Sequence, residues 1–139
     1  MKRMILFLFC FIVQSVSAGE SAFLVVINPS NPVNSIDQKY LAAIYLKKAT
    51  FWPDMKNILV VDRNFESPVR RQVSAAILER PVSAVRNYWP QIIFSGRDVP
   101  PPELKSDQAV VSFVWNHENA IGYVSNGADL HGLKVLKIR

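Results

Sequence analysis

The sequence contains little cysteine and glycine, and it has no long hydrophobic run after its first residues. Its one cysteine is Cys10, and its five glycines are scattered. A single cysteine can form neither an intramolecular disulfide nor a thiolate metal cluster. The chain also lacks a glycine-rich phosphate loop and a Gly-x-Ser-x-Gly segment, which mark many nucleotide-binding enzymes and α/β-hydrolases. These absences point away from disulfide-rich, metal-cluster and hydrolase classes.

The first eighteen residues have the pattern of a secretory signal peptide. Lys2 and Arg3 form a charged start, residues 4–13 are apolar, and residues 16–18 resemble a small-residue cleavage site. The apolar run is short for a bilayer span, so a membrane anchor is the less favoured alternative. We therefore expect a cleavable signal peptide over residues 1–18 and a periplasmic protein.

The expected mature domain, residues 19–139, lacks cysteine because Cys10 lies in the signal peptide. Sixteen basic residues, less Lys2 and Arg3, oppose eleven acidic ones, which leaves a mature charge of +3. This mild excess comes without the basic run that grips a nucleic-acid backbone. We expect one domain with no nucleic-acid partner and no stable membrane anchor after signal cleavage.

Apolar runs alternate with helical patterns along this domain. The expected strands cover residues 23–28, 58–61, 120–124 and 133–138, and the expected helices begin at Ser35, Pro68, Ser83 and Ser106. The run at 23–28 is apolar throughout, as in a strand buried on both faces. Alternating strands and helices predict an α/β sandwich around a mostly parallel sheet.

Two of these helices have local signals that the structure can test. Ser35 followed by Gln38 has the spacing of a capping box, which predicts a helix start. In the helix that begins at Ser83, Pro90 is expected to kink or divide the helical pattern.

Residues 58–71 contain the most informative chemistry. An apolar strand leads through a polar loop to Ser67-Pro68, a helix cap followed by proline at the first helical position. Free N–H groups at a helix start attract anions, and Arg63 and Arg70 add positive charge nearby. The segment predicts an anion-binding site formed by Arg63, Ser67 and Arg70. The alternative is an ordinary helix cap with solvated arginines, Arg63 pairing with Asp62 or Glu66.

Ser30 and Asn31 are further candidates for the same anion site. They follow the strand at 23–28, and open α/β sheets bind ligands beyond the carboxyl ends of their strands. On this hypothesis both side chains face the crevice that contains Arg63. The alternative is a plain proline-rich turn.

The remaining polar candidates give no pattern for metal binding or catalysis. His117, Glu118 and His131 do not have a familiar ligand spacing, and both histidines lie far from Ser67 in sequence. We expect no metal, no cofactor and no enzymatic activity. The prolines at 100–102 form either a rigid connector or a stiff segment that docks to a partner.

Five short motifs in order give the chain a recognisable resemblance. They are Asn28-Pro-Ser-Asn-Pro-Val33, Tyr40-Leu-Ala-Ala-Ile-Tyr-Leu46, Phe51-Trp-Pro-Asp54, Val61-Asp-Arg63 with Ser67, and Asn119-Ala-Ile-Gly-Tyr-Val124. The ordered set resembles the substrate-binding proteins of phosphate ABC transporters, which have the type 2 periplasmic-binding-protein fold. Full members close two lobes around an anion, and this chain resembles one lobe only.

The resemblance implies a fold and a function, and the chain departs from the family's motif at two places. The implied fold is a single three-layer α/β/α lobe with a mixed, mostly parallel sheet. Arg63 and Ser67 match the family's anion-binding arginine and serine, but Phe65 replaces an aspartate, and Pro68-Val69 replaces Gly-Thr. We expect a non-catalytic protein that binds phosphate or another oxyanion weakly or with a partner. The alternative is a ligand-free structural or adaptor module of a cell-envelope assembly.

Overall fold

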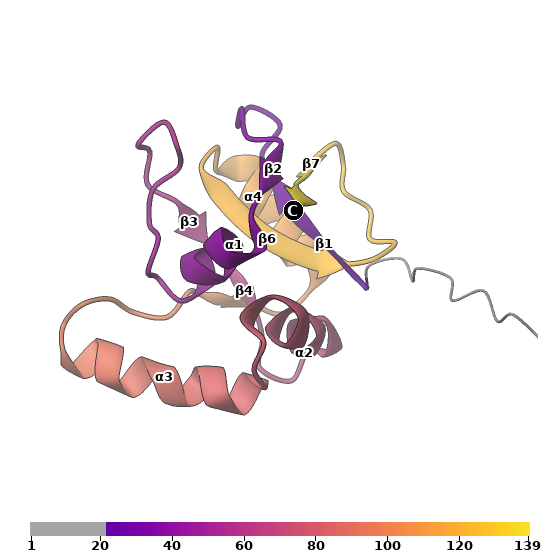
Figure 1. Ribbon diagram of the computed structural model, residues 1–139. Coiled ribbons are helices and arrows are strands. Elements are labelled where there is room, and N and C mark those ends of the chain that lie inside the picture. The colour runs from indigo at the N-terminus through magenta and orange to yellow at the C-terminus, as the bar shows by residue number, and fades with distance from the viewer. Residues whose placement is uncertain (1–21) are drawn as a thin grey trace, which may run out of the picture.

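The computed structural model describes residues 22–139, so the predicted signal peptide and Cys10 lie outside the described part. Its central sheet has four strands in the order β3, β6, β1 and β7 (Figure 1), which are β1 (Phe23–Ile27), β3 (Leu59–Val60), β6 (Ala120–Ser125) and β7 (Lys134–Val135). Strand β6 is parallel to β3 and antiparallel to β1, which is antiparallel to β7. Three strands therefore share one direction and β1 alone is reversed. This is a mixed, mainly parallel sheet, as predicted.

Helices cover both faces of this sheet. They are α1 (Gln38–Tyr45), α2 (Pro68–Val73), the π-helix η1 (Ser74–Leu78), α3 (Val82–Phe94) and α4 (Asp107–Asn116). Buried residues of α1, α2 and η1 pack on one face, and those of α4 pack on the other. The long helix α3 lies further out and contacts η1 (Figure 1). The predicted three-layer α/β/α lobe is confirmed.

Two short parallel strand pairs lie outside the main sheet. One joins β2 (Ser35–Ile36) to β8 (Lys137–Ile138), and the other joins β4 (Asp62–Arg63) to β5 (Glu103–Leu104). Each pair connects segments that are far apart in sequence. The first holds the end of the described chain against the start of α1, and the second holds Arg63 of the predicted anion site.

Strand β1 supplies side chains to both hydrophobic clusters. Phe23, Val25 and Ile27 belong to the cluster beneath α1 and α2, whereas Leu24 and Val26 belong to the cluster beneath α4. This alternation follows from the two-residue period of a strand. The predicted burial on both faces is confirmed, although both neighbours of β1 are antiparallel.

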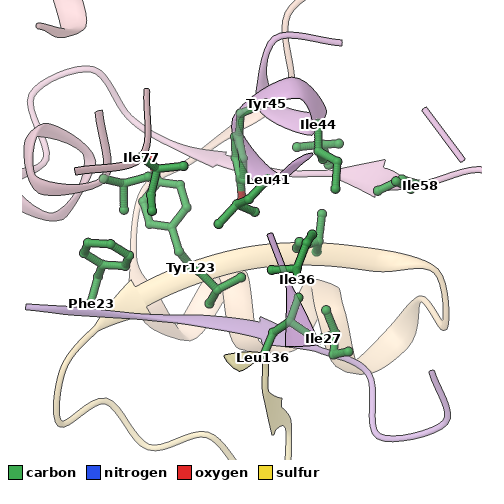
Figure 2. Packing of buried hydrophobic residues seen from close by; sticks show 14 of the residues in the cluster. Phe23, Ile27, Ile36, Leu41, Ile44, Tyr45, Ile58, Ile77, Tyr123 and Leu136 are labelled. Atoms are coloured by element: carbon green, nitrogen blue, oxygen red, sulfur yellow. The ribbon is translucent and has the colours of Figure 1, made fainter. Parts of the chain in front are cut away.

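The larger cluster is formed where α1 packs on the sheet (Figure 2). Leu41, Ile44 and Tyr45 point from α1 toward the strands, and Tyr123 points up from β6. The rings of Tyr45 and Tyr123 lie 5.5 Å apart at a tilt. Each fully buried large side chain stabilises the fold by about 1.5–3 kcal/mol, so this cluster fixes α1 over the sheet.

On the other face, a glycine lets α4 come close to the sheet. A Cβ atom at Gly122 would lie 2.6 Å from Cγ1 of Val110 and 3.1 Å from Cγ2 of Val61. Contacts this short would force α4 or the strand to move. Gly122 therefore sets the separation between α4 and β6.

The predicted helix start at Ser35 is wrong, and of the two effects expected of Pro90, the division of the helix does not occur. Ser35 does not begin a helix, because it pairs with Lys137 in the β2–β8 ribbon, and Asp37 is the N-cap of α1 instead. Gln38 donates a hydrogen bond to the Ala76 carbonyl at 2.8 Å rather than forming a capping box. Pro90 does not divide α3, which runs continuously from residue 82 to residue 94. The carbonyl that Pro90 leaves without an amide partner belongs to Arg86, and both residues are exposed.

Candidate anion-binding site

The segment that carries Arg63 leaves the main sheet immediately after β3. The Val61 amide still bonds the Ile121 carbonyl at 3.1 Å, but the Asp62 amide bonds the Pro102 carbonyl at 2.9 Å. The Asn64 amide continues this second ladder to the Leu104 carbonyl at 3.0 Å. The predicted polar loop is thus partly a strand, β4, and both of its side chains are buried. The stretch beyond the prolines at 100–102 acts as its backbone partner.

The Arg63 guanidinium is held by groups from a distant helix start. Its Nη1 donates to the Asp107 carboxylate, and its Nη2 lies 3.5 Å from the Lys105 carbonyl. Asp107 follows the N-cap Ser106, whose hydroxyl accepts the Ala109 amide at 3.0 Å. Arg63 therefore pairs with a carboxylate of α4, and its predicted alternative partners, Asp62 and Glu66, do not form this pair.

Arg70 is also engaged with carboxylates. Its Nη1 donates to the Arg63 carbonyl at 2.8 Å and to the Glu103 carboxylate at 2.5 Å, and its Nη2 lies 3.6 Å from Asp62. Burial lowers the pKa of Arg70, but the Asp62 and Glu103 carboxylates outweigh this effect and raise the pKa overall. Its side chain is buried and its charge is largely neutralised within the lobe.

Asp62 occupies the centre of this charged group. One carboxylate oxygen accepts hydrogen bonds from the Tyr123 hydroxyl and from the Arg63 amide, the latter at 2.8 Å. Burial raises the pKa of Asp62, although Arg70 and the Tyr123 hydroxyl act in the opposite direction. Burial together with the Asp62 charge also raises the pKa of Tyr123. The network ties β4 to β6 and α2.

Ser67 is the N-cap of α2 and Pro68 is the first helical residue, as the sequence predicts. The Ser67 hydroxyl nevertheless makes no capping hydrogen bond. In the described part of the chain, only two buried side-chain polar atoms lack a partner, Oγ of Ser67 and Nε of Arg63. Both atoms belong to donors that the sequence assigns to an anion.

Other side chains near α2 have local roles. Arg71 is exposed and donates to the Glu66 carbonyl at 2.9 Å. Phe65, which stands where the resemblance places an aspartate, packs against the Arg86 guanidinium of α3 at 4.1 Å from its ring centre. Neither side chain contributes a contact to the Arg63–Asp107 pair.

The structure does not bring Ser30 and Asn31 to this group. Because β1 is antiparallel to β6, residues that follow Ile27 lie at the end of the sheet where β6 begins, whereas Arg63 lies near the end of β6. The Ser30 hydroxyl donates to Asn28 at 2.8 Å, and the Asn31 side chain accepts the Val33 amide at 3.0 Å. Their predicted position in the same crevice is wrong because the strand direction is opposite to the one assumed.

The histidines lie apart from the arginines. His117 stacks on Phe113 at the end of α4, and His131 lies 3.6 Å from Asp129. Within residues 22–139, no three His, Cys, Asp or Glu side chains come together to hold a metal ion. The same residues include no helix that is both long and apolar enough to cross a bilayer.

Sequence reasoning missed the partners of both arginines. Asp107 and Glu103 follow the proline-rich segment, and Tyr123 lies in a strand that the sequence marked only as apolar. The N-cap signal at Ser106 was visible and placed Asp107 in a first helical turn. Nothing local indicates that this turn meets Arg63, because the two residues are 44 positions apart.

The comparisons with known proteins agree with this fold. A family model described as a PBP superfamily domain matches residues 11–138. An ABC-type phosphate transport receptor from Vibrio cholerae has 21% identity and a TM-score of 0.67, over 84% of this chain and 46% of that one. PstS from Borrelia burgdorferi has 16% identity and a TM-score of 0.67, over 85% and 47% of the two chains.

A third solved structure holds the ligand expected from the resemblance. It is described as a phosphate ABC transporter substrate-binding protein from Clostridium perfringens with bound phosphate, and it has 22% identity and a TM-score of 0.60, over 84% of this chain and 44% of that one. No curated protein matches this chain. The chain spans less than half the length of these solved structures, and the likeness to them is that of a single lobe.

Proposed function

This chain belongs to the PBP superfamily domain family, and we propose that it is a non-catalytic binding protein that recognises an oxyanion such as phosphate through Arg63 and Ser67. Arg63 would give charge-assisted hydrogen bonds to the anion, and the Ser67 hydroxyl would add a neutral one. We propose the periplasm as its location, in keeping with the predicted signal peptide, and phosphate transport as the process it serves.

One observation supports this proposal above the others. Nε of Arg63 and Oγ of Ser67 are buried and have no hydrogen-bond partner in residues 22–139. Buried polar atoms in folded proteins are almost always satisfied, and each exception needs an explanation such as a ligand or an ordered water. Two such donors on the segment from β4 to α2 fit an acceptor-rich ligand, and the oxygens of phosphate or sulfate are mainly acceptors.

The lone lobe would bind such an anion weakly. In this lobe, the guanidinium groups of Arg63 and Arg70 already contact carboxylates. The related structures are about twice as long as the matched region, so a second lobe or partner would have to supply further donors. The expected affinity is therefore low unless another surface closes over the site.

Titration calorimetry of the purified protein with phosphate and with sulfate at low salt tests this function. Arg63→Ala should weaken binding about 10- to 100-fold, which is the loss expected for a hydrogen bond to a charged group. Arg71→Ala, which removes the same charge from an exposed position on the following helix α2, should change the dissociation constant less than about twofold. Arg63→Lys keeps the charge but loses the planar fork and should lie between the two. Equal affinity in Arg63→Ala and wild type would refute the proposal.

A ligand-free adaptor is the second candidate, and it has its own supporting observation. Phe94 at the end of α3 is 93% exposed, and Ile93 beside it is 49% exposed. Large apolar side chains that face water together suit contact with another protein. If neither phosphate nor sulfate gives heat at millimolar concentration, the adaptor function becomes the leading one.

A further inference from the structure

The Asp107 carboxylate is bound in the way that proteins hold an external anion. Its Oδ1 accepts a hydrogen bond from the Arg63 guanidinium and another from the Ser125 amide at 3.1 Å. A charged side-chain donor and a backbone N–H that converge on one oxygen form a typical oxyanion contact. The acceptor here comes from α4, a separate element, and not from the segment that contains Arg63.

This carboxylate is more accessible than the arginine that it contacts. The Asp107 side chain is 29% exposed and the Arg63 side chain is 10% exposed. An anion that approaches Arg63 from solvent would therefore compete with a carboxylate already in contact with it. Such a replacement exchanges one set of charge-assisted hydrogen bonds for another, so the protein's own carboxylate offsets much of the attraction to a ligand.

Asp107 nevertheless leaves part of the donor set unused. Nε of Arg63 and Oγ of Ser67 remain without partners while the carboxylate is in place. One oxygen of Asp107 serves the guanidinium and the Ser125 amide, and it does not reach these two donors. A tetrahedral oxyanion has four oxygens and can accept from several directions at once, which a fixed carboxylate cannot do.

We infer that Asp107 is an internal competitor for the anion site, and that an oxyanion bonds Nη1 of Arg63 only by displacing this carboxylate. The inference rests on the proposed function and adds its regulation. Anything that draws Asp107 or the start of α4 away from Arg63 would raise the affinity for anions. The competition would apply alike to phosphate and sulfate, because it acts through charge and not through shape.

The test is calorimetry of phosphate and sulfate binding to wild type, Asp107→Asn and the double variant Arg63→Ala/Asp107→Asn. Asparagine keeps the shape and an acceptor for the Ser125 amide but removes the charge. Asp107→Asn should bind both anions at least about tenfold more tightly, and the double variant should lose that gain. Asp98→Asn is the matched control, because Asp98 is also 29% exposed and pairs with Lys47 at 3.8 Å. This control should change both affinities less than about twofold.

The outcomes separate the inference from the proposed function. If wild type binds phosphate and Asp107→Asn binds it no more tightly, the inference is wrong and the function stands. If Asp107→Asn binds sulfate better but phosphate worse, the carboxylate accepts a hydrogen bond from protonated phosphate and is no competitor. If no variant binds either anion, the proposed function itself fails. If the asparagine variant is unstable, Asp107→Ser replaces it. Urea denaturation checks that this variant folds, and its phosphate and sulfate affinities are interpreted in the same way.

Discussion

At each end of the central sheet, polar side chains follow a strand. The two ends differ in the charge of these side chains and in the partners that bind them. At the end beyond β3, Asp62, Arg63 and Arg70 are charged and buried. At the end beyond β1, the buried Asn28 is neutral. Its Nδ2 donates to the Val114 and Trp115 carbonyls at 3.1 and 3.0 Å, and its Oδ1 accepts from the Ser30 amide and hydroxyl.

This difference supports the charged end as the place of the proposed anion site. Asn28 has two donors and two acceptor sites, and the protein fills all of them, so that end is complete by itself. The charged end neutralises its arginines but leaves Nε of Arg63 and Oγ of Ser67 unbonded. Under the proposed function, the anion would bind at the charged end, and the Asn28 end would have a structural role.

The largest expected effect is the loss of Asp62, which would break the charged end. Asp62→Ala removes acceptors from Arg70, Tyr123 and the Arg63 amide and leaves a cavity. Breaking a buried ion pair from one side costs about 3–5 kcal/mol. Urea unfolding at pH 7 should show a loss of that size. Asp54→Ala, in the exposed pair with Lys56 at 3.9 Å, is the control and should cost less than about 1 kcal/mol.

The pH dependence of this cost distinguishes the charged end from the neutral one. Burial raises the pKa of Asp62 above its ordinary 3.8, so the folded chain binds this proton more tightly than the unfolded chain does. The pH-dependent part of its contribution is fully present below pH 3.8 and is lost as pH rises through the raised value, while the cost of breaking its bonds to Arg70 and Tyr123 remains at neutral pH. The cost of Asp62→Ala should accordingly be greater at acidic pH than at neutral pH. An unchanged cost across this range would contradict the raised pKa.

Loss of Asn28 should give a smaller effect at the opposite end. Asn28→Ala leaves the Val114 and Trp115 carbonyls at the end of α4 without their side-chain donor. An unsatisfied buried polar group costs about 1–3 kcal/mol. Urea unfolding should show this loss with no dependence on pH, and calorimetry should show unchanged anion binding. A changed phosphate affinity would show that the two ends are coupled.

The sequence predicted most elements because their signals are local. The apolar run of β1 and the Ser106 cap of α4 depend only on neighbouring residues, and both are confirmed. The fold followed from ordered motifs that span nearly the whole mature chain. The candidate site was predicted only in part, since Arg63 and Ser67 lie in one segment whereas Asp107 comes from another.

What sequence reasoning missed depends on strand direction and distant pairing. The reversed direction of β1 put Ser30 and Asn31 at the wrong end, and a short apolar run carries no signal for its direction. Ser35 pairs with β8 as part of strand β2, although its local sequence resembles a helix cap. In each case a long-range backbone pairing decided the outcome, and only the folded chain reveals that pairing.

The smallest expected effects on stability are those at Ser30 and Ser67. The Ser30 variant should lose a little stability and keep its phosphate affinity, whereas the Ser67 variant should keep its stability and lose affinity. Ser30→Ala removes a partly buried hydrogen bond to Asn28 and should cost about 0.5 kcal/mol without changing phosphate affinity. Loss of an N-cap serine commonly costs about 1 kcal/mol, but Ser67 makes no capping bond.

Ser67→Ala should therefore leave the free energy of unfolding within about 0.5 kcal/mol of wild type, as expected for a side chain that makes no bond. It should nevertheless weaken phosphate binding, because the anion would lose a donor that nothing else in the lobe uses. Urea unfolding and calorimetry in the Asp107→Asn background, where binding is expected to be strongest, measure both quantities on the same proteins. A loss of more than about 1 kcal/mol in Ser67→Ala would mean that the hydroxyl caps α2 in solution. It would then no longer be a donor left free for a ligand, and the proposed site would keep only the unbonded Nε of Arg63 from this pair.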